Sequence, residues 1–365
     1  MSKKILILSN HPSWTYNLRG ETIQALIKEG YDLYVAVGYG DEIEKLKEMG
    51  CKHIDVPFNR HGKNPLKELW LINSYRKAIK QVKPDVVLSY TIKPNLYGSF
   101  LCSRKGIPCI ANITGLGTAV EYPGMMRELL LRIYRLCFKG IFKVFFQNTE
   151  NRDLFIKYKI VKNNFDLLPG SGVNISKFQV IPYPSEETIE FVFISRIMRE
   201  KGIDEYLEAA KYFRSKYPFT RFHICGFCEQ NHMKVIQQMV DENIIEYHGM
   251  VKNVSEIIKK VHCSVLPTYY PEGMSNVLLE SCACGRPIIT TDRAGCREIV
   301  EDGKNGFIVK PKNSKDLIEK IELFINLEHQ EKISMGLFGR AKVEKEFDRR
   351  IVVGKYVDTI NSIFK

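Results

Sequence analysis

The chain has 365 residues, of which 44% are hydrophobic and 26% charged, a balance typical of a globular protein rather than a disordered one. An expectation of roughly 150 residues per domain predicts two domains, each large enough for a core of its own. The formal net charge of +12 favours acidic partners, such as nucleotide diphosphates, anionic membrane surfaces or nucleic acid, without choosing among them.

The ten cysteines would suit disulfides in a secreted protein, but other features favour reduced thiols. The apolar stretch at 5–8 is too short for a signal peptide and is typical of a first strand. The pairs Cys225–Cys228 and Cys282–Cys284 lack a second pair at zinc-finger spacing. We therefore expect mostly buried thiols in a cytosolic protein. No apolar run approaches the roughly 18 residues of a membrane-spanning helix.

Short apolar strands alternate with helical patterns along the first half of the chain. Gly30 is placed well to end the first helix, because glycine is favoured just past a helix C-terminus. Such alternation predicts a parallel sheet with helices on both faces. The expected strands are 4–9, 31–37, 51–57, 85–90, 108–113, 142–147 and 165–168, and the expected helices are 22–30, 41–49, 66–82 and 94–105.

The same alternation begins again after a proline-marked connector at 182–187, which indicates a domain boundary. We expect an α/β fold with two doubly wound Rossmann-like domains at 1–180 and 186–345, and a C-terminal helix at 346–365. The expected strands of the second series are 190–195, 221–225, 244–248, 263–267, 287–291 and 306–309. Its expected helices are 203–216, 233–242, 255–261, about 274–285, 316–327 and 348–364.

Two glutamates lie at the carboxyl end of a predicted strand in the second series. Glu272 lies in the loop after strand 263–267, and Glu280 lies two turns into the following helix. The first backbone N–H groups of such a helix are free to bind phosphate. Because open parallel sheets bind ligands beyond the carboxyl ends of their strands, we place the chemistry here.

This stretch resembles the E-x7-E signature of family-4 retaining glycosyltransferases. Two glutamates at this spacing arise easily by chance, so the resemblance depends also on the residues that follow. These read Gly-Arg-Pro-Ile-Ile-Thr-Thr-Asp at 285–292, Gly-Cys-Arg-Glu at 295–298 and Asp-Gly-Lys-Asn-Gly-Phe at 302–307. The resemblance implies the GT-B architecture, two doubly wound domains facing across a cleft, with the last helix crossing back onto the first domain.

The resemblance also implies roles for these residues in binding a nucleotide-sugar donor. Glu272 would meet the hydroxyls of the donor sugar, and Glu280 would bind the ribose hydroxyls. A helix-surface glutamate in an ion pair is the alternative for Glu280. Backbone N–H groups after Glu272 would bind the phosphate, and the backbone after strand 244–248 would hold the base. The remaining donor-binding residues of this domain would be Gly273, Met274, Ser275, Asn276, Gly249 and Val251.

Two cations follow the first strand of the second domain. Arg196 lies at the end of that strand, and Lys201 lies five residues later at the start of a helix. Both would stabilise a leaving diphosphate, and the family places an arginine and a lysine at this spacing for that task. Together with Glu272 they are our candidate catalytic residues. On composition alone they would be solvated surface cations.

In the first domain, Gly115 and Gly117 follow a predicted strand. Two glycines let a backbone approach a ligand closely and form an anion-binding nest, and an ordinary turn is the alternative. The loop resembles the Gly-Leu-Gly segment of bacterial members that build lipid-linked or capsular glycans, so we include both glycines among the donor contacts. The candidate acceptor contacts are His11, Arg60, Lys93 and Thr114, with Lys93 and Arg60 for an acceptor phosphate.

The first domain contains no obvious catalytic base. His-Pro-Ser-Trp at 11–14 replaces the Gly-Gly loop of many family members, and Thr114 lies near the position where some have a histidine. Retention in this family is usually explained by same-face attack, in which the leaving phosphate takes the proton. That scheme needs no metal and no cofactor. The chain contains no Asp-x-Asp of the kind that holds a divalent ion on a diphosphate.

Residues 124–146 combine a basic stripe with a wide apolar arc. On a helical wheel Arg132, Arg135 and Lys139 fall in one narrow stripe, and the remaining arc is wider than one core-facing side needs. This pattern predicts a helix in a membrane interface or beside a lipid pyrophosphate. The alternative is a buried helix with a solvated basic edge, whose end from about Phe142 is a strand.

These features predict a metal-independent retaining glycosyltransferase. It would move a sugar from a UDP-sugar to a saccharide on a lipid pyrophosphate such as undecaprenyl diphosphate. The sugar we favour is an N-acetylhexosamine. The reaction would take place at the inner face of the plasma membrane. The product would enter a bacterial surface or protein-linked glycan. A non-hydrolysing nucleotide-sugar epimerase of the same fold is the alternative enzyme. A basic nucleic-acid-binding protein is disfavoured, because the chain lacks a recognisable binding module.

Overall fold

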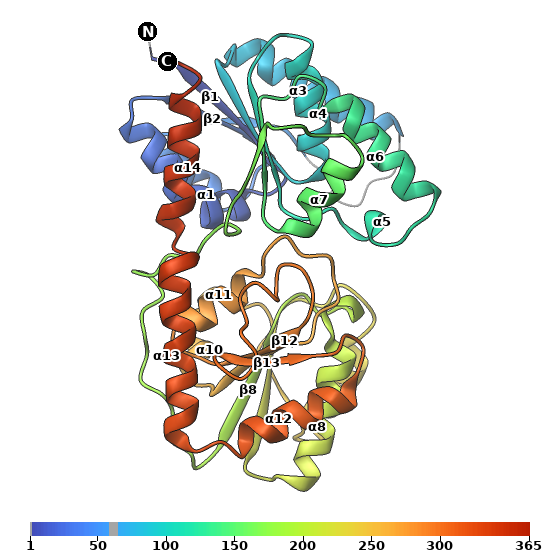
Figure 1. The fold of residues 1–365 in the computed structure, drawn as a ribbon, viewed down its shortest axis with the longest axis vertical. Coiled ribbons are helices and arrows are strands. Elements are labelled where there is room, and N and C mark those ends of the chain that lie inside the picture. Colours follow the sequence, from blue (N-terminus) through green and yellow to red (C-terminus); the bar gives the residue numbers. More distant parts are fainter. Residues whose placement is uncertain (1, 58–64) are drawn as a thin grey trace. The chain divides into compact units, whose positions relative to one another are not determined.

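The structure, a computed structural model, describes residues 2–57 and 65–365. The chain divides into two compact units (Figure 1). Unit 1 contains Met1–Ser171 and Arg350–Lys365, and unit 2 contains Gly172–Arg349. Each unit is a parallel sheet covered by helices. The expected α/β class with two Rossmann-like units is therefore confirmed.

The described part of unit 1 forms a seven-stranded parallel sheet with the order β3-β2-β1-β4-β5-β6-β7. Strands β4 and β5 at its centre are buried along their whole length, because helices cover both faces. The strands are β1 Lys4–Leu8, β2 Asp32–Val37, β3 Lys52–Asp55, β4 Val86–Tyr90, β5 Cys109–Ile113, β6 Lys143–Phe146 and β7 Phe165–Leu167. The helices are α1 Pro12–Lys28, α2 Glu42–Glu48, α3 Pro65–Val82, α4 Ile92–Ser103, α5 Thr118–Glu121, α6 Met125–Cys137, α7 Thr149–Lys157 and α14 Arg349–Asn361.

Unit 2 contains a six-stranded parallel sheet with the order β10-β9-β8-β11-β12-β13. Its strands are β8 Ile189–Ile194, β9 Thr220–Cys225, β10 Glu246–Tyr247, β11 Cys263–Leu266, β12 Ile288–Thr291 and β13 Gly306–Val309. Its helices are the short 3-10 turn Arg199–Lys201, α8 Ile203–Lys216, α9 Met233–Asp241, α10 Val254–Ile258, α11 Asn276–Ala283, α12 Ser314–Ile325 and α13 His329–Glu346.

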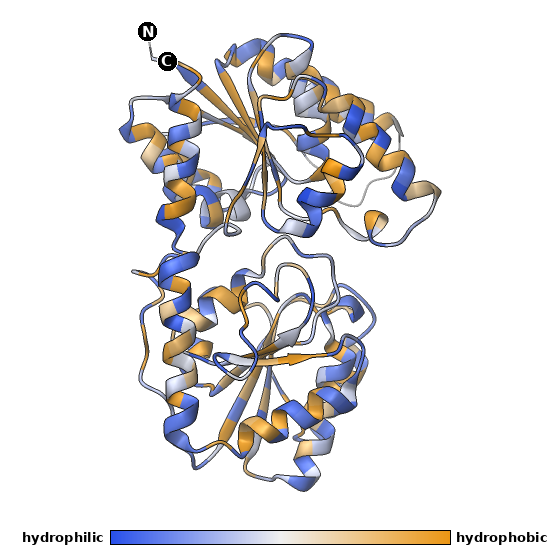
Figure 2. Ribbon diagram, viewed as in Figure 1, coloured by the Kyte–Doolittle hydropathy of each residue, from blue (hydrophilic) through white to orange (hydrophobic). Residues whose placement is uncertain are grey.

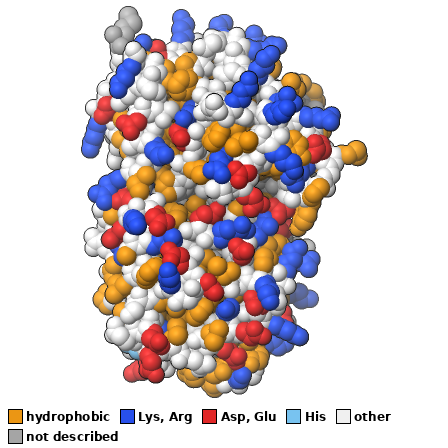
Figure 3. Space-filling view, viewed as in Figure 1, with side chains coloured by type: hydrophobic (Ala, Val, Ile, Leu, Met, Phe, Trp, Pro, Cys, Tyr) orange, Lys and Arg blue, Asp and Glu red, His pale blue; other side chains and the backbone are white. Residues whose placement is uncertain are grey.

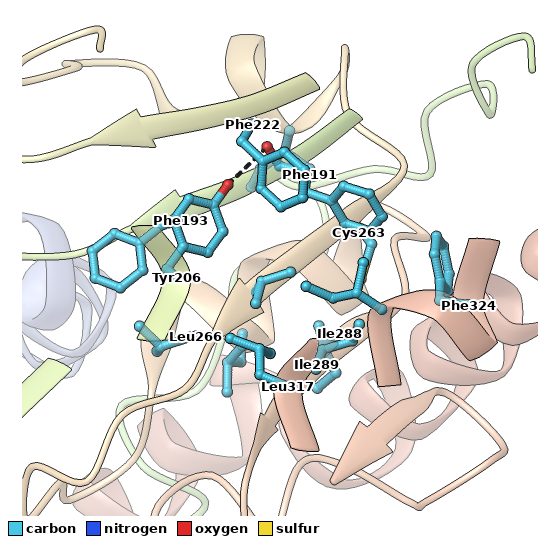
Figure 4. Close-up of a cluster of buried hydrophobic side chains, with 14 of the residues drawn as sticks. Phe191, Phe193, Tyr206, Phe222, Cys263, Leu266, Ile288, Ile289, Leu317 and Phe324 are labelled. Carbon is cyan, nitrogen blue, oxygen red and sulfur yellow. Dashed lines mark hydrogen bonds between the residues drawn. The ribbon is translucent and has the colours of Figure 1, made fainter. Parts of the chain in front are cut away.

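Apolar side chains fill the space between sheet and helices in each unit. The strands are mostly hydrophobic, whereas the helices carry one hydrophobic and one hydrophilic side (Figure 2). In unit 2, aromatic side chains from β8 and β9 pack against α8 and α12 (Figure 4). The Tyr206 hydroxyl lies within this core and donates to the backbone carbonyls of Phe191 and His223, at 3.1 and 3.0 Å. This core fixes the strands of unit 2, and the loops of the candidate site follow the ends of these strands.

Helix α14 returns the chain to unit 1. Val352, Tyr356 and Ile360 are buried in the unit 1 core, and Asn112, at the carboxyl end of β5, donates to the Tyr356 hydroxyl at 2.7 Å. Apart from its first residue, the helix belongs to unit 1 by its contacts.

The units divide between Ser171 and Gly172, ahead of the proline-marked connector at 182–187. The reason lies in Arg286, which is fully buried in unit 2. Its guanidinium donates to the carbonyls of Ile181 and Pro182, at 3.0 and 2.8 Å, and also to carbonyls at the end of α10. The connector is therefore fixed to unit 2 rather than forming a linker.

Helix α13 was absent from the sequence prediction, and its glycines explain the omission. Glycine lowers helix propensity by about 1 kcal/mol relative to alanine, so Gly336 and Gly339 weaken the helical signal. A Cβ at Gly336 would lie 2.1 Å from the carbonyl oxygen of Gly285. Glycine at 336 therefore lets α13 pack directly against the chain that follows α11.

Two helices of unit 1 differ from the sequence prediction. Helix α1 begins at Pro12, ten residues earlier than predicted, because the His11 side chain caps it by accepting the N–H of Ser13 at 3.2 Å. Helix α6 ends at Cys137, so residues 124–146 are not one helix. Lys143 belongs to β6, which confirms the alternative of a strand from about Phe142.

None of the described helices has the length and apolarity needed to cross a membrane.

Candidate active site

The predicted catalytic lysine and glutamate form an ion pair in unit 2. Lys201 ends the short 3-10 turn before α8, and its ammonium contacts the Glu272 carboxylate in the loop between β11 and α11. Only 10% of the Lys201 side chain and 15% of the Glu272 side chain are exposed. The two residues are 71 positions apart in the sequence and meet because β8 and β11 are neighbours in the sheet. Lys201 is therefore not the solvated surface cation that composition alone suggested.

Arg196 lies beside this pair and shares an aromatic neighbour with it. The Tyr270 ring lies 5.1 Å from the Arg196 guanidinium and 4.9 Å from the Lys201 ammonium. Arg196 also pairs with Glu229. Burial opposes the charged form of Arg196, but Tyr270 and Glu229 outweigh it and raise its pKa. The site therefore holds two cations close to one loop, in low-dielectric surroundings where their field is strong.

Two glycines bring the surrounding backbone close to the ion pair. Gly202 has φ of 81°, and a Cβ there would lie 2.3 Å from the Pro267 carbonyl oxygen. Gly295 has φ of 86°, and a Cβ there would lie 2.8 Å from the Glu272 Cβ. Both positions combine a left-handed conformation with close packing, so only glycine fits without strain. Gly295 thus fixes the position of the loop that carries Glu272.

The start of α11 offers fewer free N–H groups than predicted. The Ser275 N–H donates to the Gly295 carbonyl at 2.8 Å, so it is not available to a phosphate, and we remove it from the expected contacts. The Ser275 side chain does not cap the helix. The buried Oδ1 of Asn276 has no hydrogen-bond partner among the described residues. A polar atom placed in this way suits a ligand contact, because buried polar groups are normally hydrogen-bonded.

Glu280 lies on α11, at the position that the sequence predicted. The residue is half-buried, and its carboxylate makes no hydrogen bond or ion pair with the described residues. Burial raises its pKa to about 7, although the charges of Arg349 and Lys177 act in the opposite direction. The helix-surface ion pair considered as the alternative is therefore not formed, and the carboxyl is available to a ligand.

Gly249 and Val251 follow β10, as predicted. The Gly249 carbonyl accepts the N–H of Gly226 at 2.8 Å, and the Tyr247 hydroxyl donates to the Gly226 carbonyl at 2.9 Å. A Cβ at Gly226 would lie 1.8 Å from the Ser195 carbonyl oxygen. The backbones that follow β8, β9 and β10 are therefore closely packed beside Arg196.

Those predicted unit 1 residues that the structure describes lie after the carboxyl ends of its strands. Gly115 and Gly117 have φ of 126° and 71°, and Thr114 directly follows β5. His11 caps α1 and stacks on Trp14, with ring centroids 5.1 Å apart. Lys93 pairs with Glu68 at 2.6 Å, so it already has a carboxylate partner. Arg60 lies outside the described residues.

Sequence reasoning missed several residues that the structure places near the candidate site residues of each unit. Tyr270 lies two residues before Glu272, but its contact with both cations depends on the fold. Glu229 carries no recognisable sequence signal. In unit 1, the buried Arg19 lies over the Tyr90 ring at 4.5 Å, and its Nη1 has no hydrogen-bond partner in the described structure. Only the unusual burial of a charged residue identifies it.

The chain is similar to known proteins along nearly its whole length. A model for glycosyl transferases group 1 matches residues 176–336, and a glycosyl transferase 4-like model matches residues 4–148. The N,N'-diacetylbacillosaminyl-diphospho-undecaprenol alpha-1,3-N-acetylgalactosaminyltransferase of Campylobacter jejuni is 26% identical over 99% of both chains. The capsular polysaccharide biosynthesis glycosyltransferase CapM of Staphylococcus aureus is 26% identical over 95% of this chain and 94% of its own.

Solved structures show the same fold. Anabaena HepE in complex with UDP and glucose has a TM-score of 0.80 at 17% identity, covering 99% of this chain and 100% of its own. A Rickettsia africae glycosyltransferase has a TM-score of 0.79 at 19% identity, covering 100% and 99%. The architecture is thus GT-B, that of a two-domain glycosyltransferase. The chain belongs to the group 1, GT4-like glycosyltransferases.

Proposed function

We propose that this glycosyltransferase is a metal-independent, retaining enzyme that moves an N-acetylhexosamine from a UDP-sugar to a saccharide on a polyprenyl diphosphate. The observation that carries the proposal is the buried Lys201–Glu272 pair with Arg196 beside it. The Campylobacter relative, whose name specifies an N-acetylgalactosamine and an undecaprenol diphosphate acceptor, supports the choice of sugar and lipid. The UDP bound in HepE supports the choice of nucleotide.

In this proposal unit 2 binds the donor, and its two cations stabilise the leaving diphosphate. An ammonium has three N–H donors, so Lys201 can keep its contact with Glu272 and still donate to a phosphate oxygen. Negative charge on the bridging oxygen grows as the sugar–phosphate bond breaks, so fixed cations stabilise the transition state more than the ground state. Removing one such donor typically lowers kcat by about 10²–10³-fold.

The two glutamates bind different parts of the donor. Glu272 accepts hydrogen bonds from sugar hydroxyls, and the carbon that reacts is thereby held beside Lys201. Glu280 accepts hydrogen bonds from the ribose hydroxyls. This gives partners to a carboxylate that has none among the described side chains. Met274 and Asn276 at the start of α11 contribute phosphate contacts, and the backbone at Gly249 and Val251 holds the base. In the same-face scheme the departing phosphate takes the acceptor's proton, so no base from unit 1 is needed.

Unit 1 binds the acceptor in this proposal, and α6 contacts the membrane that carries it. Leu131 and Tyr134 bury one side of this helix, while Met125, Leu129 and Leu136 are exposed on the other. Exposed apolar side chains protrude at the edge of the molecule where Figure 1 places α5 and α6 (Figure 3). An apolar stripe on the outside of a helix is typical of an interfacial element.

Basic residues flank that stripe. Arg132, Arg135 and Lys139 are all exposed and lie on the solvent side of α6 and its C-terminal turn. Each basic residue near an anionic surface contributes about 1 kcal/mol of attraction. The apolar stripe and the charges together support a location at the inner face of the plasma membrane.

Vesicle binding tests this membrane contact. Replacing Arg132, Arg135 and Lys139 together with glutamate should release the protein from vesicles of anionic phospholipid, with binding measured by co-sedimentation. A control makes the same change at three exposed lysines of unit 2, Lys211, Lys315 and Lys345. Equal loss in both variants would indicate a general charge effect and overturn the role of α6.

Product mass tests the reaction. The purified enzyme is incubated with a panel of UDP-sugars and undecaprenyl-diphosphate-linked monosaccharide, in chelator, with a sample that lacks the acceptor. We expect the lipid to gain one N-acetylhexosamine, and we expect Lys201→Gln to slow the gain about 10²–10³-fold. Epimerised donor without acceptor would instead support the epimerase, and transfer that requires a divalent ion would refute the metal-independent mechanism.

A further inference from the structure

Four polar side chains share one face of the unit 2 sheet near its β10 edge. In paired parallel strands, residues in register point to the same face, and so do residues two apart along a strand. His223 of β9 is in register with Val192 of β8 and with Glu246 of β10. Glu190 lies two residues before Val192, and His248 lies two residues after Glu246. The register therefore gathers two imidazoles and two carboxylates on one face.

The side chains of this cluster are in contact. The Nδ1 of His223 lies 3.0 Å from the Nε2 of His248 and 3.4 Å from the Glu246 carboxylate. One ligand atom from each of these three residues lies within 4.8 Å of the others. On its other side, the Nε2 of His223 lies 3.0 Å from the Glu190 carboxylate.

Glu190 sets the tautomer of His223. Because Glu190 is an acceptor, the Nε2 of His223 carries the proton that joins them, and its Nδ1 is a lone pair. Without an ion, this lone pair accepts the Nε2 proton of His248 at 3.0 Å, beside the Glu246 carboxylate at 3.4 Å. In the other neutral tautomer of His248 the Nε2 is also a lone pair, so that two imidazole lone pairs and one carboxylate converge on a single point.

We infer that His223, His248 and Glu246 bind a divalent transition-metal ion of the zinc class, with Glu190 orienting His223. Ligand atoms about 2.0–2.1 Å from zinc at tetrahedral angles are about 3.3–3.4 Å apart. The Nδ1 of His223 lies 3.0 Å from the His248 nitrogen and 3.4 Å from the Glu246 oxygen, so small side-chain shifts would accommodate an ion. Two imidazoles and one carboxylate leave a fourth position for water. A carboxylate behind the ligating histidine is the usual partner that fixes its tautomer.

This site is separate from the transfer chemistry and independent of the proposed reaction. Glu272 follows β11, which lies two strands from β9, about 10 Å away at the usual strand spacing. His248 precedes Gly249, whose carbonyl accepts the N–H of Gly226. The ion would join β9 to β10, the outermost strands on this side of the sheet. The Lys260 charge also acts on His248 and opposes the binding of a cation there, against the two carboxylates of the cluster.

Binding of Co²⁺, a spectroscopic substitute for zinc, tests the inference on the metal-stripped protein. We expect one equivalent to bind with the visible absorption of a four-coordinate ion, and without the near-ultraviolet band of thiolate ligands. His248→Ala and Glu246→Gln, both at exposed positions, should each weaken binding at least tenfold. Glu190→Gln should weaken it about ten- to a hundredfold, as changes behind a ligating histidine do.

The matched control is His329→Ala, which removes a partly exposed imidazole elsewhere in unit 2 and should leave Co²⁺ binding unchanged. Circular dichroism checks that each variant is folded. If Co²⁺ does not bind, or binds equally well after both His248→Ala and Glu246→Gln, the site does not exist. A thiolate band that survives these changes would assign the metal to cysteines and overturn the inference.

Discussion

Replacing Glu280 with glutamine should stabilise the ligand-free protein and weaken its hold on the donor. The carboxyl is half-buried on α11 and makes no ion pair or hydrogen bond with the described residues. Burial raises its pKa from an ordinary value of 4.5 to about 7. Glutamine has nearly the same shape and carries no charge, so it avoids the unfavourable ionisation of a buried carboxyl.

The pKa sets the size of the effect and its dependence on pH. A rise from 4.5 to about 7 corresponds to about 3.4 kcal/mol, at about 1.4 kcal/mol per pKa unit. Partial exposure to solvent reduces this figure to about 2–3 kcal/mol. Below pH 4.5 the carboxyl is protonated in both folded and unfolded chains. Between pH 4.5 and 7 only the unfolded chain ionises, so the native protein loses stability until a plateau is reached above pH 7.

Thermal or urea unfolding across this pH range measures the difference. At pH 8 we expect Glu280→Gln to exceed the wild type by about 2–3 kcal/mol, or about 5–10 °C in Tm for a unit of this size. At pH 4.5 the two proteins should be nearly equal. Glu319→Gln, at an exposed position of α12, is the control and should stay within about 0.5 kcal/mol of the wild type. A difference that does not change with pH would refute the reasoning.

Calorimetric binding of UDP tests the second half of the prediction. Ribose hydroxyls donate to the ionised carboxylate, so affinity should fall as the pH drops through about 7. Glu280→Gln should weaken binding about tenfold or more, because a hydrogen bond to a charged group contributes about 1.5–3 kcal/mol. Affinity that is independent of both pH and the substitution would show that Glu280 does not contact the nucleotide.

Four further substitutions test the site and the fold. Lys201→Gln should lower kcat about 10²–10³-fold while circular dichroism stays unchanged, and near-normal turnover would remove Lys201 from the chemistry. Gly295→Ala should lower transfer about tenfold, measured as kcat, because its Cβ would displace the Glu272 loop; unchanged kcat would show that the loop yields freely. Gly336→Ala should destabilise unit 2 by about 2 kcal/mol or more, although alanine is the better helix former, because its Cβ would meet the Gly285 carbonyl. Gly354→Ala on α14 has no neighbour within 4 Å and should instead be neutral or stabilise by up to about 1 kcal/mol; equal effects at both positions would refute the packing argument.

Local sequence signals predicted most of the fold. The predicted helix 203–216 has the bounds of α8, because its apolar positions repeat at helical spacing and glycine precedes it. The alternation of strands and helices was sufficient to predict two parallel sheets. A helix between two strands carries the chain back along the sheet, so the second strand runs parallel to the first. The positions of Glu272 and Glu280 relative to β11 and α11 also follow from chain order alone.

Long-range packing determined what the sequence did not predict. Helix α13 was missed because the glycines that let it approach Gly285 also weaken its helical pattern. Unit 1 ends at Ser171, before the connector at 182–187, and the contacts that fix the connector to unit 2 join segments about 105 residues apart. The partners of Lys201 and Lys93 likewise depend on which strands and helices are neighbours. The raised pKa of Glu280 depends on burial, which no local pattern reports.

The return of α14 to unit 1 has a consequence for how the two units can be separated. Residues 1–171 alone would lack the buried Val352, Tyr356 and Ile360, so a simple truncation would leave their core positions open to water. The Lys3 ammonium lies 5.1 Å from the Phe364 ring, which places the two ends of the chain side by side (Figure 1). A circular permutant that joins these ends and opens the chain between Ser171 and Gly172 would therefore make each unit continuous in sequence. Each could then be cut free, folded and titrated with its own ligand.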